Sequence, residues 1–194
     1  MERRRLRLVP DAAVLRAAQA GISTLVERDL TQFWGALDLG RPEFARDALL
    51  EFVPVLVDTY GSAAASVAAD WYDEARALEV TGGGFRAIAA APVDAEVMRA
   101  QVRFGAQHLF TDDPLQTLAF LTGSAQKYAI APSRETVATS AIRDPKARGW
   151  SRVTRHGSCD FCTMLAGRGH VYTEATVGFE AHGHCNCAAS PAWH

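Results

Sequence analysis

Residues 44–75 read FARDALLEFVPVLVDTYGSAAASVAADWYDEA, and this stretch decides the expected fold. Apolar side chains recur in it mostly at steps of three and four: Phe44, Ala48, Phe52, Val55, Tyr60, Ala64, Val67, Trp71 and Ala75. This spacing is typical of one buried face of an α-helix. Pro54 lies inside the run, so we expect it to kink or split the helix, because proline removes a hydrogen bond and its ring crowds the preceding turn. The stretch therefore predicts long helical packing.

Helical patterns also precede and follow this stretch. Apolar residues recur at the same steps between Pro10 and Leu37, and Asp11 is suited to cap that helix. Shorter helices are expected at Val93–Phe110, at Asp113–Ile130 and at Ser133–Ile142, where Ser133 would start the last one. The first 145 residues therefore read as all-helical.

Two segments interrupt the helical pattern. Residues 82–84 are three consecutive glycines, whose conformational entropy makes them a flexible break. Residues 144–149 end the pattern, and residues 150–155 then alternate as a strand does. We therefore predict a mainly α protein with a long-helix domain at residues 1–145 and a small C-terminal α+β zinc-binding module at residues 146–194.

Composition places the chain among folded proteins. Its 194 residues carry a formal charge of −2, and 48% of them are hydrophobic, which argues against disorder and against a broadly basic nucleic-acid binder. A long uncharged run, residues 114–126, is shorter than the roughly 20 apolar residues that span a bilayer. The basic start is not followed by an apolar segment of the signal-peptide type. We therefore expect a soluble protein, with no membrane partner, in a reducing compartment.

The four cysteines lie close to a histidine in the last forty residues. Cys159 and Cys162 form a Cys-x-x-Cys pair, and His182, Cys185 and Cys187 follow about twenty residues later. Zinc prefers four tetrahedral thiolate and imidazole ligands, and a Cys-x-x-Cys turn offers two of them with little strain. We therefore predict one structural Zn²⁺ held by four of these five residues, with either Cys185 or Cys187 as a spare. Two disulfides, or unrelated reduced cysteines, are the alternatives.

The segment between the two clusters should complete a small α+β fold. Residues 163–166 are expected to continue as a helical turn, and residues 167–169 to end it. Residues 170–172 are expected to form a short strand. Four protein ligands would close the metal site, which favours a structural role over a catalytic one.

The arrangement of these residues resembles a known family signature. The residues that carry the resemblance are Cys159, Cys162, Leu165, Ala166, Arg168, Gly169, Val171, Tyr172, Phe179, Ala181, His182, Cys185, Cys187 and Pro191. In this spacing the chain resembles the C-terminal part of MuF-like phage head morphogenesis proteins. The stretch from residues 45–47 through residues 71–76 is similar to the actinobacteriophage branch often labelled capsid maturation protease. Here Gly183 stands where a proline often follows the histidine.

The resemblance implies a minor head protein of a tailed phage. Such a protein would lie in the virion, inside the head or at the portal vertex, and in the host cytoplasm during assembly. Its partners would be the portal protein or the major capsid protein, with contact to packaged DNA as a further expectation. It would act in assembly or in DNA delivery. Only the five metal-ligand candidates and the Arg168-Gly169 turn are carried over from the family by position.

Two enzyme classes are the alternatives. A maturation protease needs a nucleophile and an oriented base, and the helical part offers His108 alone, with Ser124 or Ser140 as an unsupported partner. A metal-dependent nuclease would use His184 and Asn186 beside the zinc module, yet no second set of ligands for a catalytic ion stands out. A structural protein is therefore the main prediction, and we assign no catalytic residue.

Aromatic residues of the long helices are candidates for partner binding. Trp34, Phe44 and Trp71 could anchor an interface, because aromatic side chains dominate interface energetics. A plain role in the core is the expected one at these positions.

Overall fold

The computed structural model describes residues 11–154 and 158–169, residues 172, 179, 181, 182 and 185, and residues 187–193. Its elements, in chain order, are α1 (Ala12–Gly35), α2 (Pro42–Glu79), α3 (Ala95–Gly105), the 3-10 helix η1 (Ala106–Phe110), α4 (Leu115–Arg143), β1 (Gly149–Val153), α5 (Asp160–Ala166) and β2 (Ala188–Ala192). The predicted mainly α class with a small C-terminal α+β part is confirmed.

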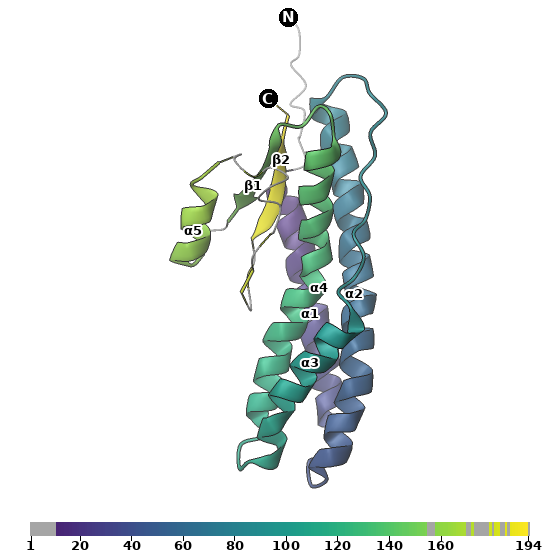
Figure 1. Cartoon of the computed structure of the whole chain (residues 1–194), viewed down its shortest axis with the longest axis vertical. Coiled ribbons are helices and arrows are strands. Elements are labelled where there is room, and N and C mark those ends of the chain that lie inside the picture. The colour runs from purple at the N-terminus through teal and green to yellow at the C-terminus, as the bar shows by residue number, and fades with distance from the viewer. Residues whose placement is uncertain are drawn as a thin grey trace, which may run out of the picture.

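The long helices form a bundle. α1, α2 and α4 run side by side along the long axis, and α3 packs beside them near one end (Figure 1). The small sheet and α5 lie beside the other half of the bundle (Figure 1). The first core fills the half that holds α3, and its largest buried side chains include Val26, Leu30, Leu49, Val53, Val57, Met98, Val102 and Leu121.

α1 begins where its capping residue predicts. The Asp11 carboxylate accepts a hydrogen bond from the Ala13 backbone N–H at 3.0 Å, which satisfies one of the donors left open at a helix start. The predicted cap is therefore confirmed, and the helix ends at Gly35, two residues before the predicted end.

α2 runs through Pro54 without interruption, so the predicted split is wrong. Pro54 is buried between Val53 and Leu56, and the packing of this face outweighs the hydrogen bond that proline removes. By length and composition α2 could also cross a membrane, a property that core helices share. Here one of its faces lies buried against the other helices.

The buried face of α2 differs from the predicted one in its first half. Ala45, Leu49 and Val53 are buried there, whereas Phe44 and Val55 are each 65% exposed. The sequence is apolar on both sides of this half, so periodicity alone does not select the face. In the second half the predicted residues Ala64, Trp71 and Ala75 are buried, whereas Val67 is 39% exposed.

The three candidate anchor residues separate into two groups. Trp34 and Trp71 are 7% and 6% exposed and belong to the cores, so the expected core role is confirmed for both. For Phe44 the expected core role is wrong. This residue lies on the surface in the first turn of α2, and the Arg41 guanidinium lies 4.8 Å from its ring centre.

The predicted glycine break begins a long extended connection, residues 80–94. Gly82 and Gly83 have φ angles of 75° and 83°, a conformation that side-chain-bearing residues rarely adopt. Beyond them the connection has no regular secondary structure, yet side chains satisfy two of its backbone donors: the Ala87 N–H donates to Asp73 and the Ala90 N–H donates to Thr136, each at 2.9 Å.

The predicted helix at residues 93–110 is divided into α3 and η1 at Gly105. A side chain at Gly105 would meet the Phe120 ring of α4, since a Cβ atom built there lies 2.5 Å from Phe120 Cδ1. The Gly105 carbonyl also accepts a hydrogen bond from the Thr117 hydroxyl at 3.0 Å. Close contact between α3 and α4 therefore fixes the position of the change in helix type.

α4 is one helix where two were predicted. Pro132 lies inside it, and Ser133 is a buried interior residue rather than a helix start. The Gln19 side chain of α1 donates to the Ser133 hydroxyl at 2.8 Å, so the serine serves helix packing. Buried side chains before and after Pro132, among them Ile130 and Val137, hold both halves of α4 in the bundle.

The sheet consists of β1 and β2 in antiparallel register, with Gly149 opposite Ala192 and Val153 opposite Ala188. β1 confirms the predicted strand, although it ends at Val153 and Arg155 lies outside the described residues. β2 was not predicted. Tyr172 forms a single bridge with Trp150, while His170 and Val171 of the predicted third strand lie outside the described residues.

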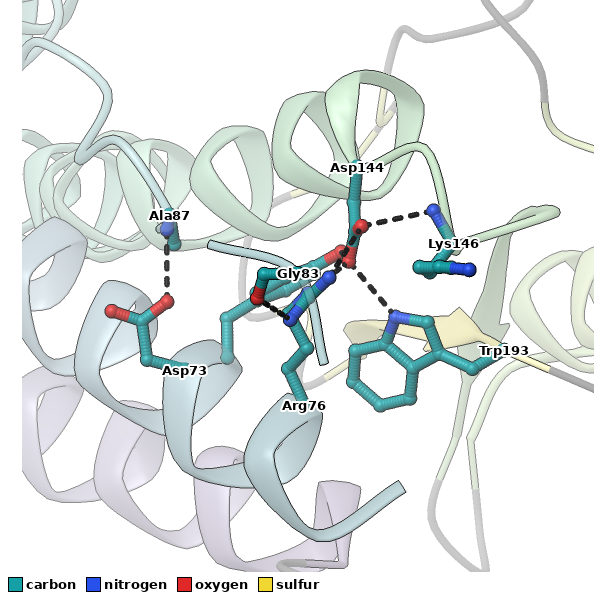
Figure 2. Close-up of polar contacts among 8 residues, drawn as sticks. Asp73, Arg76, Gly83, Ala87, Asp144, Lys146 and Trp193 are labelled. Carbon is teal, nitrogen blue, oxygen red and sulfur yellow. Dashed lines mark hydrogen bonds and ion pairs between the residues drawn. The ribbon is translucent and has the colours of Figure 1, made fainter. Parts of the chain in front are cut away.

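The Asp144 carboxylate joins the bundle to the sheet. Figure 2 shows contacts to it from the Arg76 guanidinium, the Lys146 backbone N–H and the Trp193 indole. Tyr72 also donates to it, at 3.2 Å. A second core, which contains side chains of both α2 and the sheet, surrounds this network. The boundary at residue 145, as a limit of independent folding, stays a prediction.

Candidate metal centre

The Cys-x-x-Cys pair is shaped by the start of α5. Cys159 is the N-cap of this helix in extended conformation, and Cys162 lies in its first turn. The Cys162 backbone N–H points to the Cys159 sulfur at 3.5 Å, and the Thr163 N–H donates to the Cys159 carbonyl at 3.0 Å. The helix start therefore turns both sulfurs to one side, and α5 confirms the predicted helical turn.

The second cluster brings its donors to the same place. His182 Nε2 lies 3.2 Å from Cys159 Sγ and 3.6 Å from Cys162 Sγ, and Cys185 Sγ lies 3.8 Å from Cys162 Sγ. Two sets of donor atoms each lie within 4.8 Å of one another: Cys159 with Cys162 and His182, and Cys162 with Cys185 and Cys187. Cys162 belongs to both sets, so all five predicted donors converge around it.

These separations fit a tetrahedral ion. Zinc–sulfur and zinc–nitrogen bonds of about 2.3 Å and 2.0 Å place neighbouring ligand atoms about 3.5 to 3.8 Å apart. The Cys162–His182 and Cys162–Cys185 separations lie at these values, and the Cys159–His182 separation is slightly shorter. All four cysteines are free thiols, and 3.8 Å far exceeds a disulfide bond length of about 2.05 Å. The cluster could hold a metal ion.

The four cysteines differ in how strongly their surroundings favour the thiolate form. The thiol of Cys187 donates to Cys185 and, against the cost of burial, lowers the pKa of Cys185 to about 4. The same contact and burial raise the pKa of Cys187. Hydrogen bonds from Cys162 lower the pKa of Cys159, whereas burial raises the pKa of Cys162. Thiolate, the form that binds metals, is therefore best stabilised at one member of each pair.

Comparison with known proteins gives the family. The family model described as VG15 protein matches residues 9–194, nearly the whole chain. The chain belongs to the VG15 protein family. This is a family of phage proteins, and membership indicates a virion-associated protein. No curated protein and no solved structure matches the chain.

Two arginines that the sequence did not single out lie against the cysteines. Arg134 of α4 donates through Nε to the Cys187 carbonyl at 3.0 Å and through Nη2 to the Cys185 carbonyl. Arg152 of β1 approaches Cys162 Sγ with Nη1 at 3.9 Å. Both guanidinium groups face the Phe179 ring, at 5.2 Å and 3.9 Å from its centre.

Arg134 is almost wholly buried, at 2% exposure. Burial lowers its pKa, while the nearby thiolates of Cys185 and Cys187 act in the opposite direction. No local pattern marks this residue in the sequence, because it lies on a helix some fifty positions before the cysteines that it contacts. Only the packing of α4 against the C-terminal segment identifies it.

Among the described residues, the candidates for the protease alternative do not come together, and the nuclease alternative stays untested. The His108 side chain makes no hydrogen bond to Ser124 or Ser140 in the described part of the chain: Ser124 donates to Gln101, and the Ser140 hydroxyl is buried without a partner. His184 and Asn186, which the nuclease alternative needs, lie outside the described residues.

Proposed function

We propose that this chain is a structural minor head protein of a tailed phage that binds one structural zinc ion and associates with the portal or the inner capsid. One observation carries the proposal: Cys159, Cys162 and His182 lie within ligand distances of one another, and Cys185 lies within ligand distance of Cys162, on a chain of a phage virion family. The resemblance of the same residues to the MuF-like signature supports the head assignment.

The ligand set favours zinc in a closed site. Cys159, Cys162 and His182 would supply three ligands, and Cys185 the fourth, because its sulfur lies at a tetrahedral separation from Cys162. Thiolates and imidazole in this proportion are the usual ligands of structural zinc. Cys187, which is buried and close to Cys162 and Cys185, would remain the spare thiol. Zinc would hold α5 and the residue 182–187 segment together, as small modules with little core require.

The end of the bundle that holds α3 is the proposed contact surface for the portal or capsid protein. The α1–α2 and η1–α4 turns lie together at this end (Figure 1). Next to these turns three large apolar side chains are at least half exposed, namely Phe44, Phe110 and Leu115. Exposed aromatic groups of this kind are suited to anchor a partner.

Two measurements on the purified full chain test the metal part. Elemental analysis should find about one zinc per chain. Removal of zinc by a chelator should loosen residues 158–193 in hydrogen exchange and leave most helical circular dichroism in place, since the core between α1, α2 and α4 does not contain the ligands. Absence of metal from protein expressed with zinc would contradict the proposal.

Co-sedimentation with portal and capsid assemblies tests the virion part. The wild-type chain should co-migrate with one of them, and Phe110→Ser combined with Leu115→Ser should weaken this binding. Val14→Ser is the matched control, because Val14 is equally exposed but lies at the start of α1. Incubation should leave capsid protein intact. Specific cleavage that His108→Ala abolishes would instead establish the maturation protease.

A further inference from the structure

Arg134 is a buried cation without a carboxylate partner in the described part of the chain. Two of its nitrogens donate to the Cys185 and Cys187 carbonyls, and the third, Nη1, is buried with no hydrogen-bond partner. Guanidinium stays protonated in proteins, and a buried charge that is not compensated is strongly unfavourable. Something beside Arg134 must therefore carry negative charge.

The cysteine cluster is the source of that charge. The carbonyl contacts hold the guanidinium against the backbone of Cys185 and Cys187, and Arg152 approaches the same cluster from β1. A divalent ion with three thiolates and one neutral histidine keeps one net negative charge, and four thiolates would keep two. A buried complex of this kind needs a cation nearby, because low dielectric strengthens both the penalty of isolation and the benefit of pairing.

We propose that Arg134 is the counter-cation of the metal–thiolate complex, so that metal occupancy is coupled to the packing of α4. This inference rests on the proposed metal site. The inference also explains why Nη1 has no hydrogen-bond acceptor, since the charge of the Arg134 guanidinium would be balanced by the metal–thiolate complex as a whole. Without metal, Arg134 would face thiols that carry less charge.

The test compares zinc affinity in the full-length chain by competition with a chromophoric chelator. Arg134→Met removes the charge at similar length and should weaken zinc binding about 10- to 100-fold, the usual effect of losing a group that supports metal ligands. Arg134→Lys keeps the charge but not the paired carbonyl contacts, and it should recover most of that affinity. Arg143→Met is the matched control, because Arg143 is an exposed residue of the same helix, and it should stay within twofold of wild type.

Cobalt(II) absorption provides a second readout. Saturated Arg134→Met should show the wild-type thiolate-to-metal bands, since the ligands themselves are unchanged. The inference would be overturned if Arg134→Met bound zinc within threefold of the wild-type affinity. It would also be overturned if a folded Arg134→Lys bound zinc as weakly as Arg134→Met. If Arg134→Met does not fold, loss of zinc from folded Arg134→Lys overturns it as well. A wild-type chain that binds no metal would overturn the proposed site and this inference together, whereas equal binding by all variants would overturn this inference alone.

Discussion

Arg76 and Asp144 form a two-pronged ion pair inside the molecule, with Nε 2.7 Å from Oδ2 and Nη2 3.2 Å from Oδ1. Their side chains are 7% and 0% exposed. The pair joins α2 to the residue that follows α4, and Trp193 bonds to the same carboxylate from the end of the sheet. It therefore controls how the helices and the sheet are held together.

Removal of the Asp144 charge should be strongly destabilising. Asp144→Asn would leave the buried Arg76 unpaired, and breaking one side of such a pair usually costs about 3 to 5 kcal/mol. Urea unfolding followed by circular dichroism measures this loss. Glu96→Gln is the control, because the Glu96–Arg99 pair is exposed and should contribute about 1 kcal/mol or less. A similar small loss for both variants would contradict the role of the buried pair.

The same carboxylate should make stability depend on acidity. Burial alone would raise the pKa of Asp144, but hydrogen bonds from Arg76, the Lys146 N–H and Trp193 together hold it below its ordinary value. A lowered pKa in the folded state means that the stabilisation is present above about pH 4, the unfolded value, and is lost as pH falls through the folded value. The free energy of unfolding should fall as pH is lowered from 5 to 2. In Asp144→Asn it should fall less steeply over the same range.

Two glycine substitutions should change stability in opposite directions. Gly105→Ala would place Cβ 2.5 Å from Phe120 Cδ1, and the ring would have to move, at about 1 to 3 kcal/mol. Gly21→Ala, in the interior of α1 with no atom within 4 Å, should stabilise by about 0.5 to 1 kcal/mol. Thermal melting measures both. In a Phe120→Ala background the cost of Gly105→Ala should largely disappear, and its persistence there would contradict the steric explanation.

The cysteines should differ in their importance for metal binding. Cys162→Ser should remove the metal most completely, because this sulfur belongs to both sets of converging donors. Cys185→Ser should lose more metal than Cys187→Ser, since Cys185 lies at a tetrahedral separation from Cys162. Zinc content after dialysis gives the order directly. Equal retention by all three variants would exclude the proposed ligand set.

Periodicity predicted the helices but misplaced two of their boundaries. Pro54 suggested a kink or a split, because the local rule counts a lost hydrogen bond and a ring clash, and Ser133 suggested a new helix start. In the structure both residues lie inside continuous helices, on faces that are buried by packing. The Asp11 cap was predictable because the hydrogen bond that defines it is local.

The site was predictable where its donors are close in sequence and not where they are distant. Cys159 and Cys162 share a recognisable spacing, whereas Arg134 reaches the cluster only through tertiary packing. β2 was not predicted for a similar reason, because it depends on a contact between residues that are distant in sequence. Its sequence, residues 188–192, has low strand propensity and contains Pro191, and it becomes a strand by pairing with β1 at the edge of a two-stranded sheet.

The register of β1 and β2 has a consequence for loop closure. Val153 pairs with Ala188, so the ladder closes the chain segment that contains all five candidate ligands. The entropy of bringing the two ends of this segment together is lost once, whether the ladder or the metal forms first. Each therefore lowers the entropic cost of the other, and a substitution that weakens the ladder far from any sulfur should also weaken metal affinity.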